Sequence, residues 1–320
     1  MSKKNIEIRQ NVLLSDFTTF RVGGPARWFC MAKTIKDIKS ALNFAREKNI
    51  DYFILAGGSN LIVSDEGYKG LIIKIEFENL KIKSSRIKAG SGYILDKLVD
   101  IADKKGLKGL EWAGGLPGTI GGAVRGNAGA FNGEIKDIVS SVRSLKLSSN
   151  NYELSTKNNT ECQFGYRESI FKYNNEIILE VELQMDKGDP KLLKEKSEYT
   201  RKYRKEKHPI EFPCAGSIFK NIPVKSCTYE VQERFKDVIK TDPFPVIPTA
   251  AILADAGLKG FQIGEAQISE KHPNYIINLG NSKAQSIVAV IEHVVATVKE
   301  KYNITLEVEP QLLGFDKKFE

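Results

Sequence analysis

The feature that most constrains this chain is a glycine-rich stretch from Gly114 to Gly133, GGLPGTIGGAVRGNAGAFNG, in which eight of 20 positions are glycine. Ordering so much glycine costs backbone entropy, so the density needs a local reason. A common reason is a backbone that approaches a bound pyrophosphate and donates its N–H groups to it. A flexible linker is the alternative. Because Leu116, Ile120 and Val124 stand between the glycines, we expect an ordered anion-binding segment.

Length and composition indicate a multi-domain protein with reduced thiols. The chain has 320 residues, more than a typical single domain. Its net charge of +8 comes from Lys and Arg mixed with carboxylates along the sequence, which suits anionic ligands as well as nucleic acid. The four cysteines show no metal-ligand spacing, and there is no secretory leader or membrane-spanning run. We therefore expect a cytoplasmic protein without a metal and without a membrane partner.

A second glycine loop, Ala56-Gly57-Gly58-Ser59-Asn60, follows a short apolar run at 52–55 that predicts a strand. A strand followed by such a turn suits a phosphate, although a plain turn has the same composition. Two such segments in successive α/β-type units favour a dinucleotide over a mononucleotide. Neither has the G-x-G-x-x-G pattern with a later acidic residue, and no P-loop is present. The sequence thus predicts a dinucleotide held by a different fold.

Apolar periodicity divides the chain into three parts. We expect boundaries near residues 75 and 206, with a smaller third part to 302 and a tail, 303–320, that returns to the second part. The expected helices begin at a Thr34–Asp37 capping box, run from Leu95 to near Gly106, and carry Ile287, Ile291, Val294 and Val298 on one face. The expected strands include 71–75, 139–147, 176–184 and 304–309, and a basic connector covers 191–207.

Three short clusters carry groups that could do chemistry. They are Tyr166-Arg167, the turn around Ser217 with Lys220 and Asn221, and Glu309 in the tail. Each also has an ordinary structural explanation, as a surface ion pair, a turn or a solvated carboxylate.

Histidines are scarce, and their sequence context favours structural roles. His208 and His272 each precede a proline and are expected in loops, whereas His293 is expected on a helix surface. No metal-ligand or Ser-His-Asp set can be assembled from the chain. Acid–base chemistry would therefore fall to hydroxyl, carboxylate and guanidinium groups.

These motifs, in this order, resemble the family of UDP-N-acetylenolpyruvylglucosamine reductases (MurB), flavoenzymes of bacterial peptidoglycan synthesis. The matching segments span roughly 300 residues, and although each is weakly specific, their common order makes chance negligible. They are TTFRVGG at 18–24, AGGSNL at 56–61, GLPGTIGGAVRGNAGA at 115–130, YRES at 166–169, GSIFKN at 216–221, AGLKG at 256–260 and SEKHPNYIIN at 269–278.

The resemblance implies an α+β fold, with an FAD-binding part of two α/β subdomains (1–75 and 76–206) and a smaller α+β substrate-binding domain (207–302). FAD would bind non-covalently, because residues 56–61 and 115–130 contain no His or Cys to tether it. NADPH would reduce the flavin, and the enolpyruvyl nucleotide sugar would then take the hydride. The pyrophosphate would rest on Ala56, Gly57, Gly58, Ser59, Asn60, Gly115, Gly118, Thr119, Gly121 and Gly122.

The resemblance also assigns roles to the three clusters. Ser217 would protonate the substrate α-carbon, Arg167 would hold and polarise the substrate carboxylate, and Glu309 would stabilise the enol. The remaining matched positions would line the substrate site, and they are Tyr166, Lys207, Lys220 and Asn221.

Several positions depart from the family pattern. Ile222 stands where a proline is usual, and Pro310-Gln311 replaces a dipeptide that ends in arginine, which removes a positive charge that would bind an anion there. Pro310 also lacks a backbone donor, which restricts it to a strand edge or bulge. Ala56 replaces a frequent glycine. The 50 positions between Arg167 and Ser217 match the shorter subtype, which lacks an extra tyrosine-bearing loop.

Two alternatives remain open on the sequence alone. A flavin-dependent alcohol or sugar oxidase could share the fold, but it would often tether its flavin covalently. A basic nucleic-acid-binding protein would need aromatics among its cations, and Tyr199 and Tyr203 lie within the basic connector. We favour the reductase, and we expect it to act as a monomer on a small molecule without a nucleic-acid partner.

Overall fold

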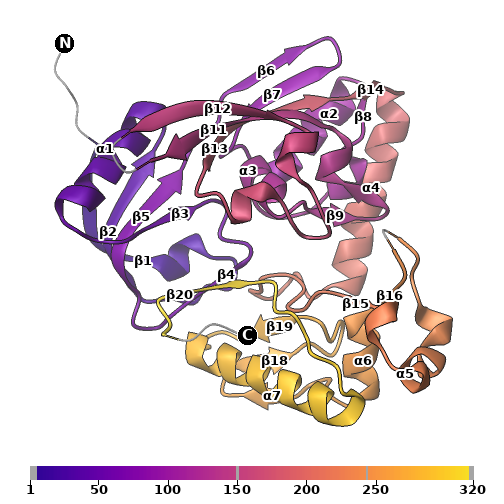
Figure 1. Cartoon of the computed structure of the whole chain (residues 1–320). Helices are drawn as coiled ribbons and strands as arrows, with labels where there is room; N and C mark the ends of the chain where they lie inside the picture. The colour runs from indigo at the N-terminus through magenta and orange to yellow at the C-terminus, as the bar shows by residue number, and fades with distance from the viewer. Residues whose placement is uncertain (1–5, 149–150, 243, 317–320) are drawn as a thin grey trace, which may run out of the picture. The chain divides into compact units, whose positions relative to one another are not determined.

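The structure is a computed structural model that describes residues 6–148, 151–242 and 244–316. It divides into two compact units, each assembled from separate parts of the chain (Figure 1). The first unit comprises Met1–Val12, Ala26–Gly57 and Lys69–Tyr203, and the second comprises Leu13–Pro25, Gly58–Tyr68 and Arg204–Glu320. The mixed helices and strands of both units confirm the predicted α+β class.

A four-stranded sheet with one helix opens the first unit. Its strand order is β1 (Arg9–Leu13), β2 (Pro25–Ala32), β5 (Tyr68–Ile75), β3 (Tyr52–Leu55), with β3 and β5 parallel. Helix α1 (Ile35–Glu47) begins at the predicted capping box, in which Thr34 and Asp37 each accept a hydrogen bond from the other's backbone N–H. The apolar face of α1 is buried with the strands, so this part follows the local sequence signals closely.

A five-stranded antiparallel sheet forms the rest of the first unit's framework. Its order is β12 (Tyr152–Asn158), β11 (Val139–Leu147), β13 (Ile177–Gln184), β7 (Arg86–Gly90), β6 (Leu80–Lys83). Val139 and Val142 of β11 are buried in a core shared with α2 (Leu95–Lys104) and α3 (Ile120–Arg125). The basic connector is helix α4 (Pro190–Lys207), and short pairs complete the unit: β8 (Leu107–Lys108) with β14 (Asp186–Lys187), and β9 (Gly129–Ala130) with β10 (Gly133–Glu134).

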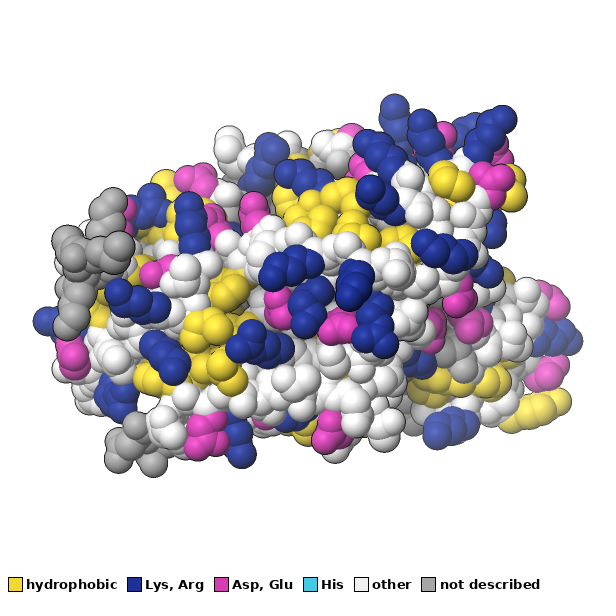
Figure 2. Space-filling model, turned by 90° about the horizontal axis from the view of Figure 1, so that it is seen from above, with side chains coloured by type: hydrophobic (Ala, Val, Ile, Leu, Met, Phe, Trp, Pro, Cys, Tyr) yellow, Lys and Arg dark blue, Asp and Glu magenta, His cyan; other side chains and the backbone are white. Residues whose placement is uncertain are grey.

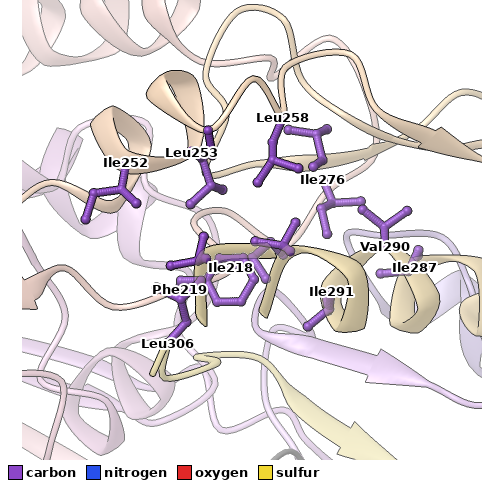
Figure 3. Packing of buried hydrophobic residues seen from close by; sticks show 14 of the residues in the cluster. Ile218, Phe219, Ile252, Leu253, Leu258, Ile276, Ile287, Val290, Ile291 and Leu306 are labelled. Atoms are coloured by element: carbon purple, nitrogen blue, oxygen red, sulfur yellow. The ribbon is translucent and has the colours of Figure 1, made fainter. Parts of the chain in front are cut away.

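The second unit packs short strands against one long helix. Helix α7 (Ala284–Tyr302) contacts β17 (Gln262–Ile263) and β18 (Ala266–Ile268), which pairs with β19 (Ile276–Asn278). The four predicted inward positions of α7 are fully buried, which confirms its amphipathic face. Figure 3 shows this core, in which Ile287 and Ile291 lie with Ile218 and Phe219. The remaining elements are β15 (Ile222–Pro223), β16 (Val246–Ile247), α5 (Tyr229–Arg234) and α6 (Thr249–Asp255).

The tail differs from the prediction of a strand at 304–309. Ile304 and Leu306 are buried in alternation, as a strand would bury them, but only Val308 makes a ladder bridge, to Phe219. The prediction was wrong because alternation reports burial on one face and not the presence of a long partner strand. Pro310, which has no N–H, separates this segment from the regular strand β20 (Gln311–Leu313).

The tail packs within the second unit, not with residues 76–206 as the sequence suggested. Strand β20 runs parallel to β4 (Leu61–Val63), a strand from the first quarter of the chain. Nearby, both carboxylate oxygens of Asp65 accept hydrogen bonds from the first turn of α7, from the N–H of Ala284 (3.0 Å) and of Gln285 (3.1 Å). Early and late parts of the chain therefore complete each other in one core.

The surface and the thiols agree with the composition. Figure 2 shows Lys and Arg side chains distributed over one face and interspersed with carboxylates. All four cysteines are free, and burial raises the pKa of Cys30 to about 12 and of Cys162 to about 11. Among the helices described here, none is long and apolar enough to cross a membrane.

Candidate functional site

The two glycine loops touch each other through their backbones. A Cβ added to Gly57 would lie 2.6 Å from the Cα of Gly118, a separation that real side chains do not adopt. Gly118 itself has a φ of +108°, which disfavours residues with a side chain. The Cβ of Ala56 is 3.7 Å from where a Cβ on Gly122 would be, an ordinary contact. Glycine at 57 and 118 therefore lets two loops approach that are about 60 positions apart in sequence.

Helix α3 follows the second loop and is fixed by its own cap. The Thr119 side chain accepts a hydrogen bond from the N–H of Gly122, and Thr119 is itself buried. A Cβ on Gly121 would lie 2.6 Å from the Cβ of Ser91, so this glycine is also required by packing. The buried hydroxyl of Ser91 has no hydrogen-bond partner among the described residues. An unsatisfied buried hydroxyl costs about 1–3 kcal/mol unless a bound group satisfies it.

Residues 58–60 of the first loop belong to the second unit and pack within it. Gly58 has a φ of +64°, and a Cβ there would lie 1.9 Å from the carbonyl oxygen of Phe17. The Asn60 side chain donates to the backbone carbonyl of Glu309 (3.1 Å). The backbone carbonyl of Asn60 accepts from the N–H of Gln311 (3.0 Å). Asn60 thus fixes the backbone on both sides of Pro310.

Arg167 lies at the tip of a tight turn. Gly165 and Glu168 exchange two backbone hydrogen bonds, of 3.0 and 3.1 Å, and between them Arg167 adopts a φ of +58°, which is uncommon for a residue with a side chain. Its guanidinium donates to the carbonyl of Gly129 (3.0 Å) and lies 5.2 Å from the centre of the Tyr166 ring. The turn therefore presents Arg167 beside the end of the glycine-rich segment.

The same turn is fastened to that segment by two further contacts. The Ser169 hydroxyl donates to the carbonyl of Arg125 (2.7 Å), and the buried Asn127 side chain donates to the carbonyl of Gly165 (2.7 Å). Burial lowers the pKa of Arg125, while Glu168 acts in the opposite direction. The first unit thus brings together Tyr166, Arg167 and the glycine loop.

Ser217 lies where three distant segments meet in the second unit. The residue before it, Gly216, has a φ of +78°, and the two residues after it, Ile218 and Phe219, point into the core (Figure 3). The N–H of Ile218 donates to the carbonyl of Asn274 (2.8 Å), and its carbonyl accepts from the N–H of Glu309 (2.8 Å). The pairing of Ile218 with two segments therefore places the backbone of partly exposed Ser217 near that of Glu309.

The other predicted substrate residues have contacts of their own. Lys220 forms an ion pair with Glu307 (2.9 Å), and the Asn221 side chain accepts from the N–H of Thr249 at the start of α6 (3.2 Å). Lys207 is exposed as the last residue of α4. Ile222, at the position of the expected proline, is buried in β15 and pairs with Ile247.

Sequence reasoning missed a ring cluster directly behind Ser217. Tyr275 is buried, and its hydroxyl shares a hydrogen bond with Ser217 and lies 3.2 Å from Nδ1 of His208. The rings of His208 and His272 are 5.2 Å apart, and each lies about as far from the Tyr275 ring. The only signal in the sequence was HPNY at 272–275, which gives no hint of Ser217.

Burial keeps this cluster neutral. It raises the pKa of Tyr275 to about 12 and, together with the neighbouring His272, Arg204 and Lys271, lowers the pKa of His208 to about 4. Burial also lowers the pKa of His272. At neutral pH the unit thus holds a hydroxyl, two neutral imidazoles and the Glu309 region around Ser217, a set of groups able to donate and pass protons.

Comparison with known proteins covers nearly the whole chain. A family model described as "UDP-N-acetylenolpyruvoylglucosamine reductase, C-terminal domain" matches residues 208–313, and one described as "FAD binding domain" matches residues 26–151. The UDP-N-acetylenolpyruvoylglucosamine reductase of Clostridium tetani is 37% identical over 97% of this chain and 93% of its own length. That of Clostridium novyi is 35% identical over 96% and 92%. The crystal structure of the corresponding reductase (MurB) from Thermus caldophilus matches with a TM-score of 0.75 at 28% identity, covering 97% of this chain and 99% of that one.

Proposed function

This chain belongs to the family of UDP-N-acetylenolpyruvoylglucosamine reductases, and we propose that Ser217, Arg167 and Glu309 carry its chemistry. It is an FAD-dependent oxidoreductase of peptidoglycan synthesis that reduces UDP-N-acetylglucosamine enolpyruvate to UDP-N-acetylmuramate, with NADPH as hydride donor. Bound FAD supplies the hydride that adds to the enol-ether double bond. What the protein must add is binding, charge stabilisation and a proton.

The first and second glycine loops fit the cofactor's pyrophosphate. The side-chain-free contact of Gly57 with Gly118 and the partnerless hydroxyl of Ser91 support this assignment. The residues that would hold the cofactor are Ala56, Gly57, Gly58, Ser59, Asn60, Gly115, Gly118, Thr119, Gly121 and Gly122. Since neither loop contains a His or Cys, the cofactor would bind non-covalently.

Ser217 would give the α-carbon its proton. Ser217 is partly exposed and the next residue, Ile218, is fixed by backbone hydrogen bonds to Asn274 and Glu309, and this is the observation that carries the assignment. A hydroxyl fixed in position can deliver a proton without the entropy loss of ordering a mobile group. The N–H of Glu309 itself donates to the carbonyl of Ile218, so its carboxyl group starts from a backbone position near Ser217 and would stabilise the enol form.

Arg167 would bind the substrate carboxylate. A guanidinium pairs with a planar carboxylate through two parallel hydrogen bonds, and the pair strengthens as negative charge develops. Its place in a turn fastened to the glycine segment supports this role. Tyr166, Lys207, Lys220 and Asn221 would contact the rest of the nucleotide sugar. We also propose that the protein works as a cytoplasmic monomer, with residues 1–75 and 76–206 serving FAD and 207–302 serving the sugar nucleotide.

The half-reactions of a Ser217→Ala variant test this proposal. Flavin reduction by NADPH should stay within about twofold of wild type, because no proton from Ser217 is needed there. Reoxidation by the enolpyruvyl sugar should slow by roughly 10²–10³ or more, the usual cost of losing a positioned donor. Stopped-flow absorbance of the flavin follows both steps.

Ser226→Ala is the matched control, since the Ser226 hydroxyl is exposed and donates to the carbonyl of Pro223 (2.7 Å) in the same unit. It should leave both half-reactions unchanged. Equal loss of both half-reactions in Ser217→Ala would show that Ser217 is structural and would remove the proposal.

A further inference from the structure

Ser217 must recover a proton after each turnover, and the group behind it is Tyr275. The Tyr275 side chain is 8% exposed, and its hydroxyl contacts Ser217 on one side and Nδ1 of His208 on the other, at 3.2 Å. His208 is only partly buried, at the C-terminal end of α4. Ser217, Tyr275 and His208 therefore form a continuous line of hydrogen-bonding groups from the reacting position towards solvent.

From this arrangement we propose that Tyr275 is a positioning residue, which orients the Ser217 hydroxyl and, with His208, returns a proton to it. The inference rests on the proposed role of Ser217. In the tautomer with its proton on Nδ1, His208 donates to Tyr275 and Tyr275 donates to Ser217. The proton of Ser217 then points away from both, towards the substrate.

The proton balance of the relay is simple. The Ser217 O–H bond breaks as its proton forms the new C–H bond, and in the same step the Tyr275 proton moves to the Ser217 oxygen, so no free alkoxide forms. The Nδ1 proton of His208 moves to Tyr275, and Nε2 of His208 takes a proton from solvent. One proton is transferred in total and no electrons move. All three groups end neutral, so no charge is left buried, and His208 ends in its other tautomer, which exchanges with solvent to regain the Nδ1 proton before the next turnover.

The surroundings of Tyr275 keep the relay in its neutral form. The titratable groups that act on its hydroxyl are Cys214, Arg204, which is buried at the end of α4, and Glu309, from the tail. Burial is the largest influence and raises the pKa of the phenol, as Cys214 and Glu309 do, whereas Arg204 lowers it. The His272 ring packs edge-on against the Tyr275 ring. The buried Nδ1 of His272 has no hydrogen-bond partner among the described residues. Without a competing acceptor, Tyr275 is left to Ser217 and His208.

Tyr275→Phe is the direct test, because it removes the hydroxyl and keeps the packed ring. We expect NADPH-driven flavin reduction within about twofold of wild type and reoxidation by the enolpyruvyl sugar slowed about 10- to 100-fold. In a relay, more than one proton moves in the rate-limiting step. A plot of the wild-type reoxidation rate against the D2O fraction of the solvent should therefore be curved. For Tyr275→Phe this line should become straight, a change that a purely structural role would not produce.

Tyr302→Phe is the matched control, because the Tyr302 hydroxyl binds Asp255 in the same unit, at the end of α7, and its pKa is likewise raised to about 12. It should leave the rates and the curvature unchanged. Wild-type reoxidation in Tyr275→Phe, alongside blocked reoxidation in Ser217→Ala, would overturn the relay and leave Ser217 as the donor. Fast reoxidation in Ser217→Ala would instead remove the proposed function and the relay with it.

Discussion

The cofactor loops of the first unit and the Ser217 region of the second are built by different means. In the loops, the determining contacts are between backbones: Gly57 lies against Gly118, and the N–H of Gly121 donates to the carbonyl of Ser91 (3.0 Å). Around Ser217, side chains are essential to the arrangement, with Tyr275 between Ser217 and His208 and the Asn60 side chain donating to the backbone of Glu309, in addition to the backbone hydrogen bonds of Ile218. A site formed by close backbone contacts can be recognised in the sequence by its glycines. A site formed by side chains from distant segments cannot, because it depends on which residues the fold brings together.

Gly57→Ala is expected to have the largest effect, and it tests whether close backbone contact forms the cofactor loops. The new methyl group would overlap the Cα of Gly118, so one loop has to move. We expect a loss of about 1–3 kcal/mol in the free energy of unfolding and at least a tenfold weaker retention of FAD. Urea denaturation and the flavin absorbance of the purified protein measure the two effects.

Gly126→Ala is the control from the same segment, because a Cβ there would have only an ordinary contact, 3.6 Å from the carbonyl oxygen of Gly122. It should change the unfolding free energy by less than about 1 kcal/mol. If Gly57→Ala retains its flavin as well as Gly126→Ala does, backbone contact is not what builds the cofactor loops.

An intermediate effect is expected from acid on the Ser217 region. The pKa of His208 is about 4 in the folded protein against an ordinary 6.5, so the unfolded chain takes up this proton at a higher pH. Stability is therefore lost as the pH falls from 6.5 towards 4, by about 2 kcal/mol between pH 7 and pH 5 for this group. His272, whose pKa is also lowered, acts in the same direction.

Urea unfolding of wild type and His208→Asn at pH 7 and pH 5 measures this contribution. The variant has no imidazole to protonate, so its stability should fall less between the two pH values. An equal fall in both proteins would show that His208 does not titrate between the two states and that the ring cluster is less buried than described.

The smallest effect is expected from a change at Asn60, which tests whether its side chain serves the cofactor loops or the Ser217 region. The sequence assigns Asn60 to the cofactor, but its side-chain amide donates to the carbonyl of Glu309. Asn60→Ala should cost about 1 kcal/mol of stability and slow reoxidation by the enolpyruvyl sugar about three- to tenfold, with FAD retained. Loss of FAD with an unchanged rate in the loaded enzyme would place the Asn60 side chain with the cofactor instead. Flavin titration and stopped-flow absorbance separate the two outcomes.

Local signals in the sequence predicted much of the fold. The capping box at Thr34, the end of α2 before Gly106 and the buried face of α7 each depend on residues within a few positions of one another, and all were confirmed. The prediction of a strand at 304–309 was wrong. The alternation of its residues reports burial, and the segment forms only one β-bridge with its neighbour, residues 218–220.

The site was predictable only where a motif carried it. Arg167, Ser217 and Glu309 were found through matched motifs, and their roles remain proposals. Tyr275 and His208 were not predicted as site residues. They are 67 positions apart, and their proposed role depends on the hydrogen bond that forms between them in the folded chain. Single-sequence periodicity reports which face is buried, but it does not report which buried residues will be neighbours.

The pairing of β4 with β20 and the capping of α7 by Asp65 set an order of events during synthesis. Residues 61–65 leave the ribosome more than 200 positions before the segments that they bind. Until then β4 has an unpaired edge, whereas the five-stranded sheet of the first unit has all its strands by residue 184. A nascent chain stopped before Leu313 would therefore expose this edge, and a chaperone that binds extended segments would find it there.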